Sequence, residues 1–114
     1  MDHWKVTENE DSIVITCSGH DKSEKYVAAV RKFELCVARR PAAFRVIADL
    51  REMTGYESAA RQAWQQAFRE SRRVMRTVVF VGARSTGIRM GAAVVGAVAG
   101  VPVRFVDDWS EIND

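Results

Sequence analysis

Cysteine and histidine are scarce in this chain, and their placement excludes several kinds of chemistry. Two cysteines and two histidines occur among 114 residues, as His3, Cys17, His20 and Cys36. This scatter lacks the paired close spacing of a zinc site. We therefore expect no metal, no cofactor and no disulfide. Cys17 and Cys36 lie in apolar segments, where a reduced thiol packs as a small hydrophobe.

Long apolar runs and targeting segments are also lacking. The most apolar stretch, 91–103, falls short of the ~20 residues that a membrane-spanning helix needs, and Gly96, Gly100 and Pro102 interrupt it. No basic segment precedes an apolar run at the N-terminus, as it does in a signal peptide. The sequence therefore predicts a cytoplasmic protein with no membrane span.

What is present is the composition of an ordinary globular protein. The chain is 47% hydrophobic and 28% charged, which predicts ordered structure almost throughout. Its length is close to that of the commonest single domains. We therefore expect one domain over residues 1–114.

Hydrophobic periodicity predicts alternating strands and helices. Apolar and polar residues alternate over 4–7 and 13–17, and the polar run 8–12 reads as a hairpin turn between two strands. Asp21 and Glu24 suggest a capping box for a first helix, which should end at 39–40 before a proline.

The remaining segments continue this alternation. Strands are expected over 44–50, 77–81 and 101–106, helices over 58–73 and 86–99, and a short helical turn from Asp107-Asp108 to Ile112. The order β-β-α-β-α-β-α-β predicts an α/β fold. We expect a mixed, mostly parallel five-stranded sheet with an antiparallel N-terminal edge.

Three segments resemble the STAS superfamily, and in particular the SpoIIAA-like anti-sigma-factor antagonists. They are Ile15 to Asp21, the stretch from Phe44 through Asp49-Leu50 to Ser58, and Val78 to Gly82 with Val103 to Phe105. The resemblance implies a bacterial, non-catalytic regulatory domain that binds a protein partner, such as an anti-sigma factor or a kinase-like regulator. It places the partner surface at 54–61, with Thr54, Tyr56, Glu57, Ser58 and Arg61 as candidate contacts.

The phosphorylation motif of the antagonists is altered in this sequence. The resemblance puts the family's acidic position on Glu57 and its first serine on Ser58. The second serine, which carries the phosphate in those proteins, falls on Ala59, and the glycine falls on Ala60. Ser58 has two interpretations: the N-cap of the second helix, which we favour, or a phosphorylation site stabilised by the helix dipole.

A second candidate site is the loop 82–87, which has the glycine spacing of a P-loop. Ile88 and Arg89 replace the residues that would touch phosphate and magnesium, so nucleotide hydrolysis is not expected. Two interpretations remain for Arg84, Ser85, Thr86 and Arg89. In the first, the four residues form an anion site. In the second, which we favour, Ser85 or Thr86 caps a helix and the arginines are solvated.

Other functions have less support. No nucleophile signature surrounds any serine or cysteine, so we expect no enzyme. Trp64 and Phe68 lie among the arginines from Arg61 to Arg76 but are needed for the core, so no aromatic platform remains for stacking bases, which argues against nucleic-acid binding. The glycines and alanines of 87–99 form a small-residue surface. We favour the interpretation that this surface packs closely on the sheet; the alternative is that it contacts a second copy in a homodimer.

The alternative function is a domain that binds a small molecule, a lipid or an anion, because some relatives of this fold hold apolar molecules between helix and sheet. A cavity lined by Trp64, Phe68, Val79 and Phe105 would favour that alternative. A filled core beneath an exposed loop containing Tyr56 would favour the protein partner.

Overall fold

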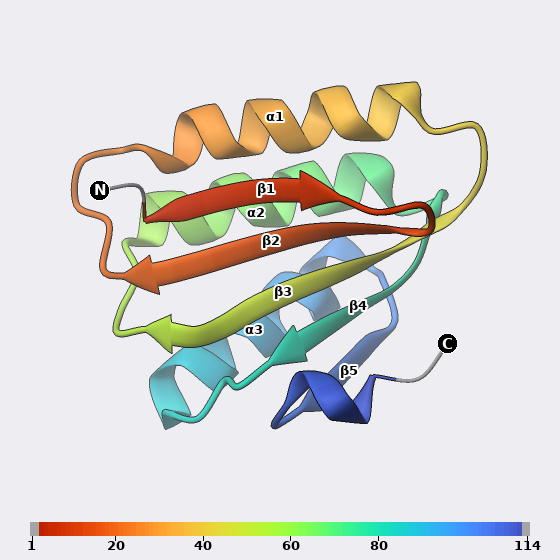
Figure 1. Ribbon diagram of the computed structural model, residues 1–114. Helices are drawn as coiled ribbons and strands as arrows, with labels where there is room; N and C mark the ends of the chain where they lie inside the picture. Colours follow the sequence, from red (N-terminus) through yellow and green to blue (C-terminus); the bar gives the residue numbers. More distant parts are fainter. Residues whose placement is uncertain (1–2, 113–114) are drawn as a thin grey trace.

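A five-stranded sheet forms the centre of the computed structural model, which describes residues 3–112 (Figure 1). The strands lie in sequence order, with β1 antiparallel to β2 and all other neighbours parallel, as predicted. β3 is therefore the central strand. The strands are β1 Trp4–Glu8, β2 Ser12–Gly19, β3 Phe44–Met53, β4 Met75–Val81 and β5 Val103–Val106.

Three helices connect the parallel strands: α1 Tyr26–Arg39, α2 Ser58–Ser71 and α3 Thr86–Ala99. Each links one strand to its neighbour in the same direction, so right-handed crossovers place all three on one face of the sheet. Figure 1 shows α2 and α3 behind the strands and α1 above β1, so that α1 lies at one end of the row and α3 at the other. A final 3-10 turn, η1, spans Trp109–Glu111.

An aromatic cluster fills the space between the sheet and the first two helices. Phe33 of α1 is fully buried, and its ring centroid lies 5.8 Å from that of Trp64 and 5.5 Å from that of Phe68. Trp64 and Phe68 both belong to α2, and their centroids are 6.0 Å apart. These two residues are thus the anchors of α2, as the helical spacing predicted.

The opposite face of the sheet is partly covered by the end of the chain. Val79 and Val81 are buried there in a cluster that includes Trp109. The indole of Trp109 donates to Asp49 Oδ2 at 2.9 Å, and the Arg51 guanidinium pairs with the same carboxylate at 2.9 Å. Burial raises the pKa of Asp49, but these hydrogen bonds outweigh it and hold the pKa below its ordinary value. The ionised carboxylate therefore fixes η1 on the sheet.

Two helix starts test the predicted caps. Asp108 and Glu111 form a capping box on η1, which confirms a capped turn near the C-terminus. The box predicted for Asp21 and Glu24 is wrong, because α1 begins only at Tyr26 and Glu24 adopts a φ of 64°. The buried Asp21 carboxylate instead accepts from the Ser23 and Tyr26 backbone N–H groups, at 2.8 and 3.1 Å.

Strand lengths differ from the predicted ones where strands pair. β3 runs to Met53, three residues past the predicted end at Leu50, and β2 reaches Gly19. After an irregularity near Thr16, the two extensions pair with each other in register, Gly19 opposite Met53. Backbone pairing with a neighbour thus prolongs both strands through residues that have no apolar pattern.

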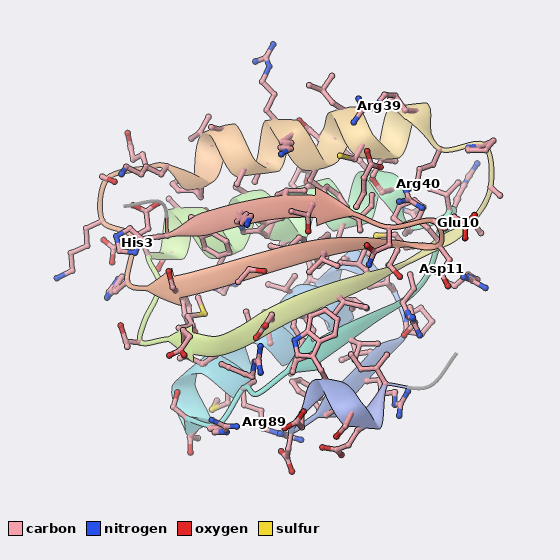
Figure 2. The ribbon with its side chains drawn as sticks, in the orientation of Figure 1. His3, Glu10, Asp11, Arg39, Arg40 and Arg89 are labelled. Carbon is pink, nitrogen blue, oxygen red and sulfur yellow. The ribbon has the colours of Figure 1, made fainter. Side chains whose placement is uncertain are left out.

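Arg40, at the C-cap of α1, holds the hairpin between β1 and β2 (Figure 2). Its guanidinium is nearly buried and donates to the backbone carbonyls of Glu10 and Ser12, at 3.0 and 2.8 Å, and to that of Asn9. A charged donor on three turn carbonyls fixes the hairpin against the helix end.

The described part of the chain, residues 3–112, contains no helix long and apolar enough to cross a bilayer. Cys17 and Cys36 are free and buried. Burial raises the pKa of the Cys17 thiol to about 12, so it stays protonated and unreactive at neutral pH.

Candidate functional site

The segment that follows β3 lies at the surface, at the carboxyl end of the central strand. We call residues 54–61 the rim segment; it comprises the connection after β3 and the first turn of α2. Thr54, Glu57, Ser58 and Ala59 are exposed, Tyr56 and Arg61 are half-buried, and Ala60 alone is buried. The rim segment is therefore accessible, as expected from the strand order.

Contacts with the end of β2 fix the first half of the rim segment. The Thr54 N–H donates to the Gly19 carbonyl at 2.9 Å, and His20 Nε2 lies 2.7 Å from Glu57 Oε2. Between these contacts the backbone passes close to the imidazole, because a Cβ added at Gly55 would lie 2.6 Å from His20 Nδ1. The glycine permits this approach, and the connection has a defined shape.

The start of α2 differs from the predicted one. Glu57, with an extended backbone, occupies the N-cap position, and Ser58 is the first helical residue. The interpretation of Ser58 as the N-cap is therefore wrong. The reason is tertiary: the Glu57 carboxylate pairs with His20 and makes no cap hydrogen bond. Among residues 3–112, no side chain accepts from the N–H groups of this first turn, although an exposed helix start can use such an acceptor.

Tyr56 leaves the rim segment and lies across α3. Its hydroxyl donates to the Gly87 carbonyl at 3.2 Å, and a Cβ added at Gly91 would lie 2.4 Å from Tyr56 Oη. The phenol ring thus packs directly against Gly91, where a larger residue would clash with it. This close contact explains a glycine inside a helix despite its low helix propensity. The sequence predicts a close approach at this helix without indicating which residue makes it.

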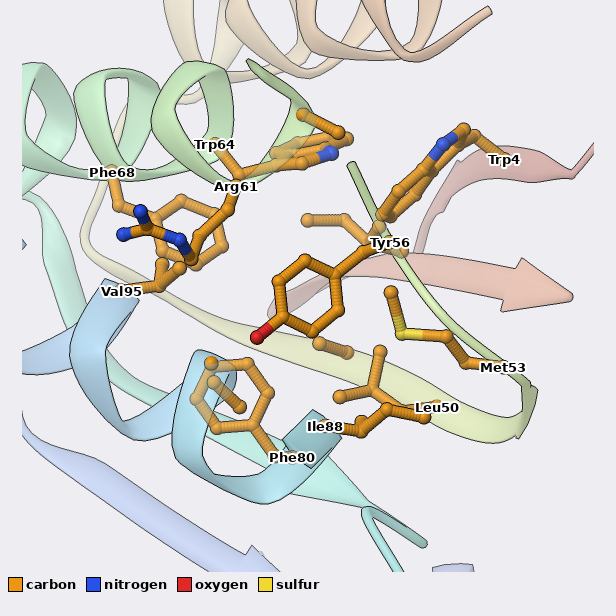
Figure 3. Close-up of a pocket in the computed structure, with 15 residues that line it drawn as sticks. Trp4, Leu50, Met53, Tyr56, Arg61, Trp64, Phe68, Phe80, Ile88 and Val95 are labelled. Atoms are coloured by element: carbon orange, nitrogen blue, oxygen red, sulfur yellow. The ribbon is translucent and has the colours of Figure 1, made fainter. Parts of the chain in front are cut away.

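An apolar pocket of about 70 Å³ lies beneath Tyr56, between α2, α3 and the sheet (Figure 3). Of the four residues whose lining would favour a ligand, Trp64 and Phe68 line it, but Val79 and Phe105 do not. Phe80 lines the pocket in place of Val79, because neighbouring residues of a strand face opposite sides of the sheet. Val79 is buried under η1, and Phe105 stacks behind Phe80 at a centroid distance of 5.4 Å.

Three polar groups accompany this apolar lining. The indoles of Trp4 and Trp64 have centroids 5.4 Å apart, and no acceptor within residues 3–112 reaches either buried N–H. Each such donor costs about 1–3 kcal/mol while it lacks an acceptor. Arg61, half-buried at the pocket, donates only to Gln65 among the described side chains, at 3.3 Å. The pocket can thus hold an apolar body, and the two indole N–H groups are buried next to it without being exposed to its interior.

The residues of the second candidate loop are not gathered into one site. Ser85 is the N-cap of α3, as favoured, and its hydroxyl oxygen accepts from the Ile88 N–H at 3.2 Å. Arg89 extends to β5, where its guanidinium lies 4.3 Å from the centre of the Phe105 ring. Arg84 and Thr86 are exposed. The cation–π contact thus directs Arg89 to a neighbouring strand.

Comparison with known proteins supports the fold. No family model and no curated protein matches the sequence. Among solved structures, the chain is similar to an uncharacterized protein of the DUF3478 family with a SpoIIAA-like fold, from Shewanella loihica PV-4. The TM-score is 0.71 at 14% identity, over 95% of this chain and 87% of that one. The chain therefore has the SpoIIAA-like α/β fold that its sequence resembles, and identity this low carries the fold alone.

Proposed function

We propose that this chain is a non-catalytic regulatory domain that binds a protein partner on its rim segment. The observation that carries the proposal is the position of this segment. It follows the central strand and exposes Glu57, Ser58 and Ala59 beside the uncapped start of α2. Backbone N–H groups there can donate hydrogen bonds to a carboxylate or carbonyl of another protein.

The shape of the rim segment favours binding. Contacts from Gly19, His20 and Gly87 hold it on both sides before any partner arrives. A segment that is already ordered loses little conformational entropy when it binds, which leaves more of the contact energy for affinity. The resemblance implies an anti-sigma factor or a kinase-like regulator as the partner. Ser58, exposed at the helix start, is the position where a phosphate would alter that contact.

Capture from a lysate of the source cells tests this proposal. We expect the wild-type chain to recover a protein that Ala59→Arg does not, because the arginine would add bulk and like charge at the positive helix end. Gln66→Arg is the matched control, since Gln66 is exposed on the same helix about two turns away. Mass spectrometry identifies the captured proteins. Equal recovery by all three chains, or no recovery by any, would contradict partner binding at the rim segment.

The pocket favours a second candidate function, binding of a small apolar molecule. The present volume of about 70 Å³ is below the roughly 150 Å³ of a cavity that holds benzene. A larger occupant must therefore displace Tyr56, whose hydroxyl has one hydrogen bond of 3.2 Å to the protein. The phenol ring then acts as a lid that the ligand replaces.

Hexanoate provides a direct test of the pocket, because its chain suits the apolar lining and its carboxylate suits the half-buried Arg61 at the pocket. We expect a saturable change in the fluorescence of Trp4 and Trp64 with the wild type and with Ala93→Leu, which alters an exposed position. Ala92→Leu fills the pocket from its wall and should abolish the change. A wild type without saturation, or an Ala92→Leu chain that still binds, would remove this function and leave the partner proposal untouched.

A further inference from the structure

The rim segment and the pocket share a wall. Tyr56, Ala60 and Arg61 of the rim segment line the pocket. Glu57 and Ser58, which lie between the first two of these in the chain, are exposed. One side of the rim segment thus borders the cavity, and the other side faces the solvent, where the proposed partner surface lies. A change inside the pocket can therefore reach the partner surface through the same few residues.

The helices on either side of the pocket are held in place. Trp64 and Phe68 anchor α2 in the aromatic cluster. α3 packs closely on its neighbours, as favoured for its small residues, because a Cβ added at Gly96 would overlap Val103 Cγ2. Close-packed elements of this kind resist displacement as a whole. An occupant larger than the cavity therefore gains room by moving a side chain rather than a helix.

Tyr56 is the part of the wall that is best placed to move. It is half-buried and belongs to the connection between β3 and α2. Its hydroxyl donates one hydrogen bond to the protein, to the Gly87 carbonyl at 3.2 Å. Figure 3 shows its ring in the middle of the labelled lining residues, with the hydroxyl directed toward α3. Outward rotation of this one ring opens the cavity to the solvent.

The same rotation removes a contact that holds the rim segment in shape. Two contacts tie this segment to the end of β2, from Thr54 to Gly19 and from Glu57 to His20. Tyr56 ties it to α3 on the other side. When the ring leaves, the connection loses its attachment to α3, and the ring itself lies at the surface beside the start of α2. A partner that fits the ordered segment must then restore its shape, which costs binding free energy.

We propose that the pocket regulates the rim segment: a small apolar molecule that displaces Tyr56 lowers the affinity of the rim segment for its protein partner. This inference rests on the proposed partner binding and on occupancy of the pocket. The coupling is reciprocal, so a bound partner lowers the affinity of the pocket for the molecule by the same factor. Couplings between sites are typically about 5–150-fold, and we expect about tenfold for the loss of one attachment.

Tyr56→Phe tests the displacement without a partner. The phenylalanine keeps the ring but loses the hydrogen bond to Gly87, so the lid opens at a lower cost. We expect hexanoate to bind this variant about two- to tenfold more tightly than it binds the wild type, measured by the tryptophan fluorescence. An unchanged or a lower affinity would mean that Tyr56 stays in place, and it would overturn the inference.

Capture from the lysate in the presence of hexanoate separates the coupling from the partner proposal. A protein recovered by the wild type should fall by about tenfold when hexanoate saturates the pocket. Ala92→Leu, whose pocket is filled, should recover the protein equally with and without hexanoate. Equal recovery by the wild type in both conditions overturns the coupling and leaves partner binding standing. No recovery in either condition contradicts the partner proposal, and the coupling falls with it.

Amide hydrogen exchange, followed by NMR, tests the effect on the rim segment with no partner present. The N–H groups of Thr54 and Arg61 donate to the Gly19 and Glu57 carbonyls, so they report local opening. Saturating hexanoate should speed their exchange about tenfold in the wild type and in Ala93→Leu, and leave Ala92→Leu unchanged. A ligand that only stabilises the folded chain slows exchange. Slower or unchanged exchange in the wild type at saturation would therefore overturn the inference.

Discussion

Replacing Phe33 with alanine is expected to lower the free energy of unfolding by about 3–5 kcal/mol. The ring is fully buried and contacts both Trp64 and Phe68, so its removal leaves a cavity where α1 meets α2. Domains of this kind are stable by roughly 5–15 kcal/mol. The loss is therefore a large part of the total, and urea unfolding followed by circular dichroism measures it.

Leu35→Ala is the matched control for this prediction. Leu35 lies two residues further along α1 and is 58% exposed, so the change should alter stability by no more than about 0.5 kcal/mol. Phe33→Leu extends the test if the alanine variant does not fold, and it should lose less because most of the volume is retained. Equal losses at Phe33 and Leu35 would contradict the aromatic cluster as the main attachment of α1.

Gly82→Ala is expected to destabilise the protein by about 2–3 kcal/mol. Gly82 follows β4 with a φ of 71°, a conformation that residues with a Cβ rarely adopt. The added Cβ would also lie 2.3 Å from Arg51 Cγ and 3.1 Å from Arg51 Cα. The side-chain carbon can move, but the backbone carbon of Arg51 belongs to the central strand and resists displacement.

Gly87→Ala provides the comparison that isolates this strain. A Cβ at Gly87 meets nothing within 4 Å, and its backbone is helical. Both substitutions restrict the unfolded chain to the same extent, so their difference reports the folded state alone. We expect Gly87→Ala to raise stability by about 0.5 kcal/mol, measured by the same urea unfolding. If the two alanine variants prove equally stable, the conformation assigned to Gly82 is wrong.

Local patterns in the sequence were sufficient for the order of elements. The apolar run 77–81 predicts a buried strand, and β4 contains it. The predicted bounds of the third helix agree with α3, because local signals set both ends: the Ser85 hydroxyl caps the start, and Gly100, with a φ of 77°, ends the helix. Where a boundary depends on a neighbouring strand, as at Met53, the sequence gives no such signal.

The candidate site was predictable in position and not in detail. The strand order placed residues 54–61 at an accessible edge, since the connection after a central parallel strand emerges at the carboxyl end of the sheet. The interpretation of Ser58 as the N-cap failed because His20, 37 residues from Glu57, engages that carboxylate. A contact between residues so far apart in the chain produces no hydrophobic periodicity in either segment, so the sequence pattern does not predict it.

The sequence by itself determined which segments are strands and helices, their order, and hence the SpoIIAA-like arrangement, because hydrophobic periodicity and turn residues act over a few neighbouring positions. Only the tertiary structure decided that Phe80 rather than Val79 faces the pocket, that Tyr56 lies on Gly91, and that the outward half of α3 is uncovered. These are questions of which side chains meet across separate elements. An apolar residue is equally suited to either face of a buried strand, so packing alone makes the choice.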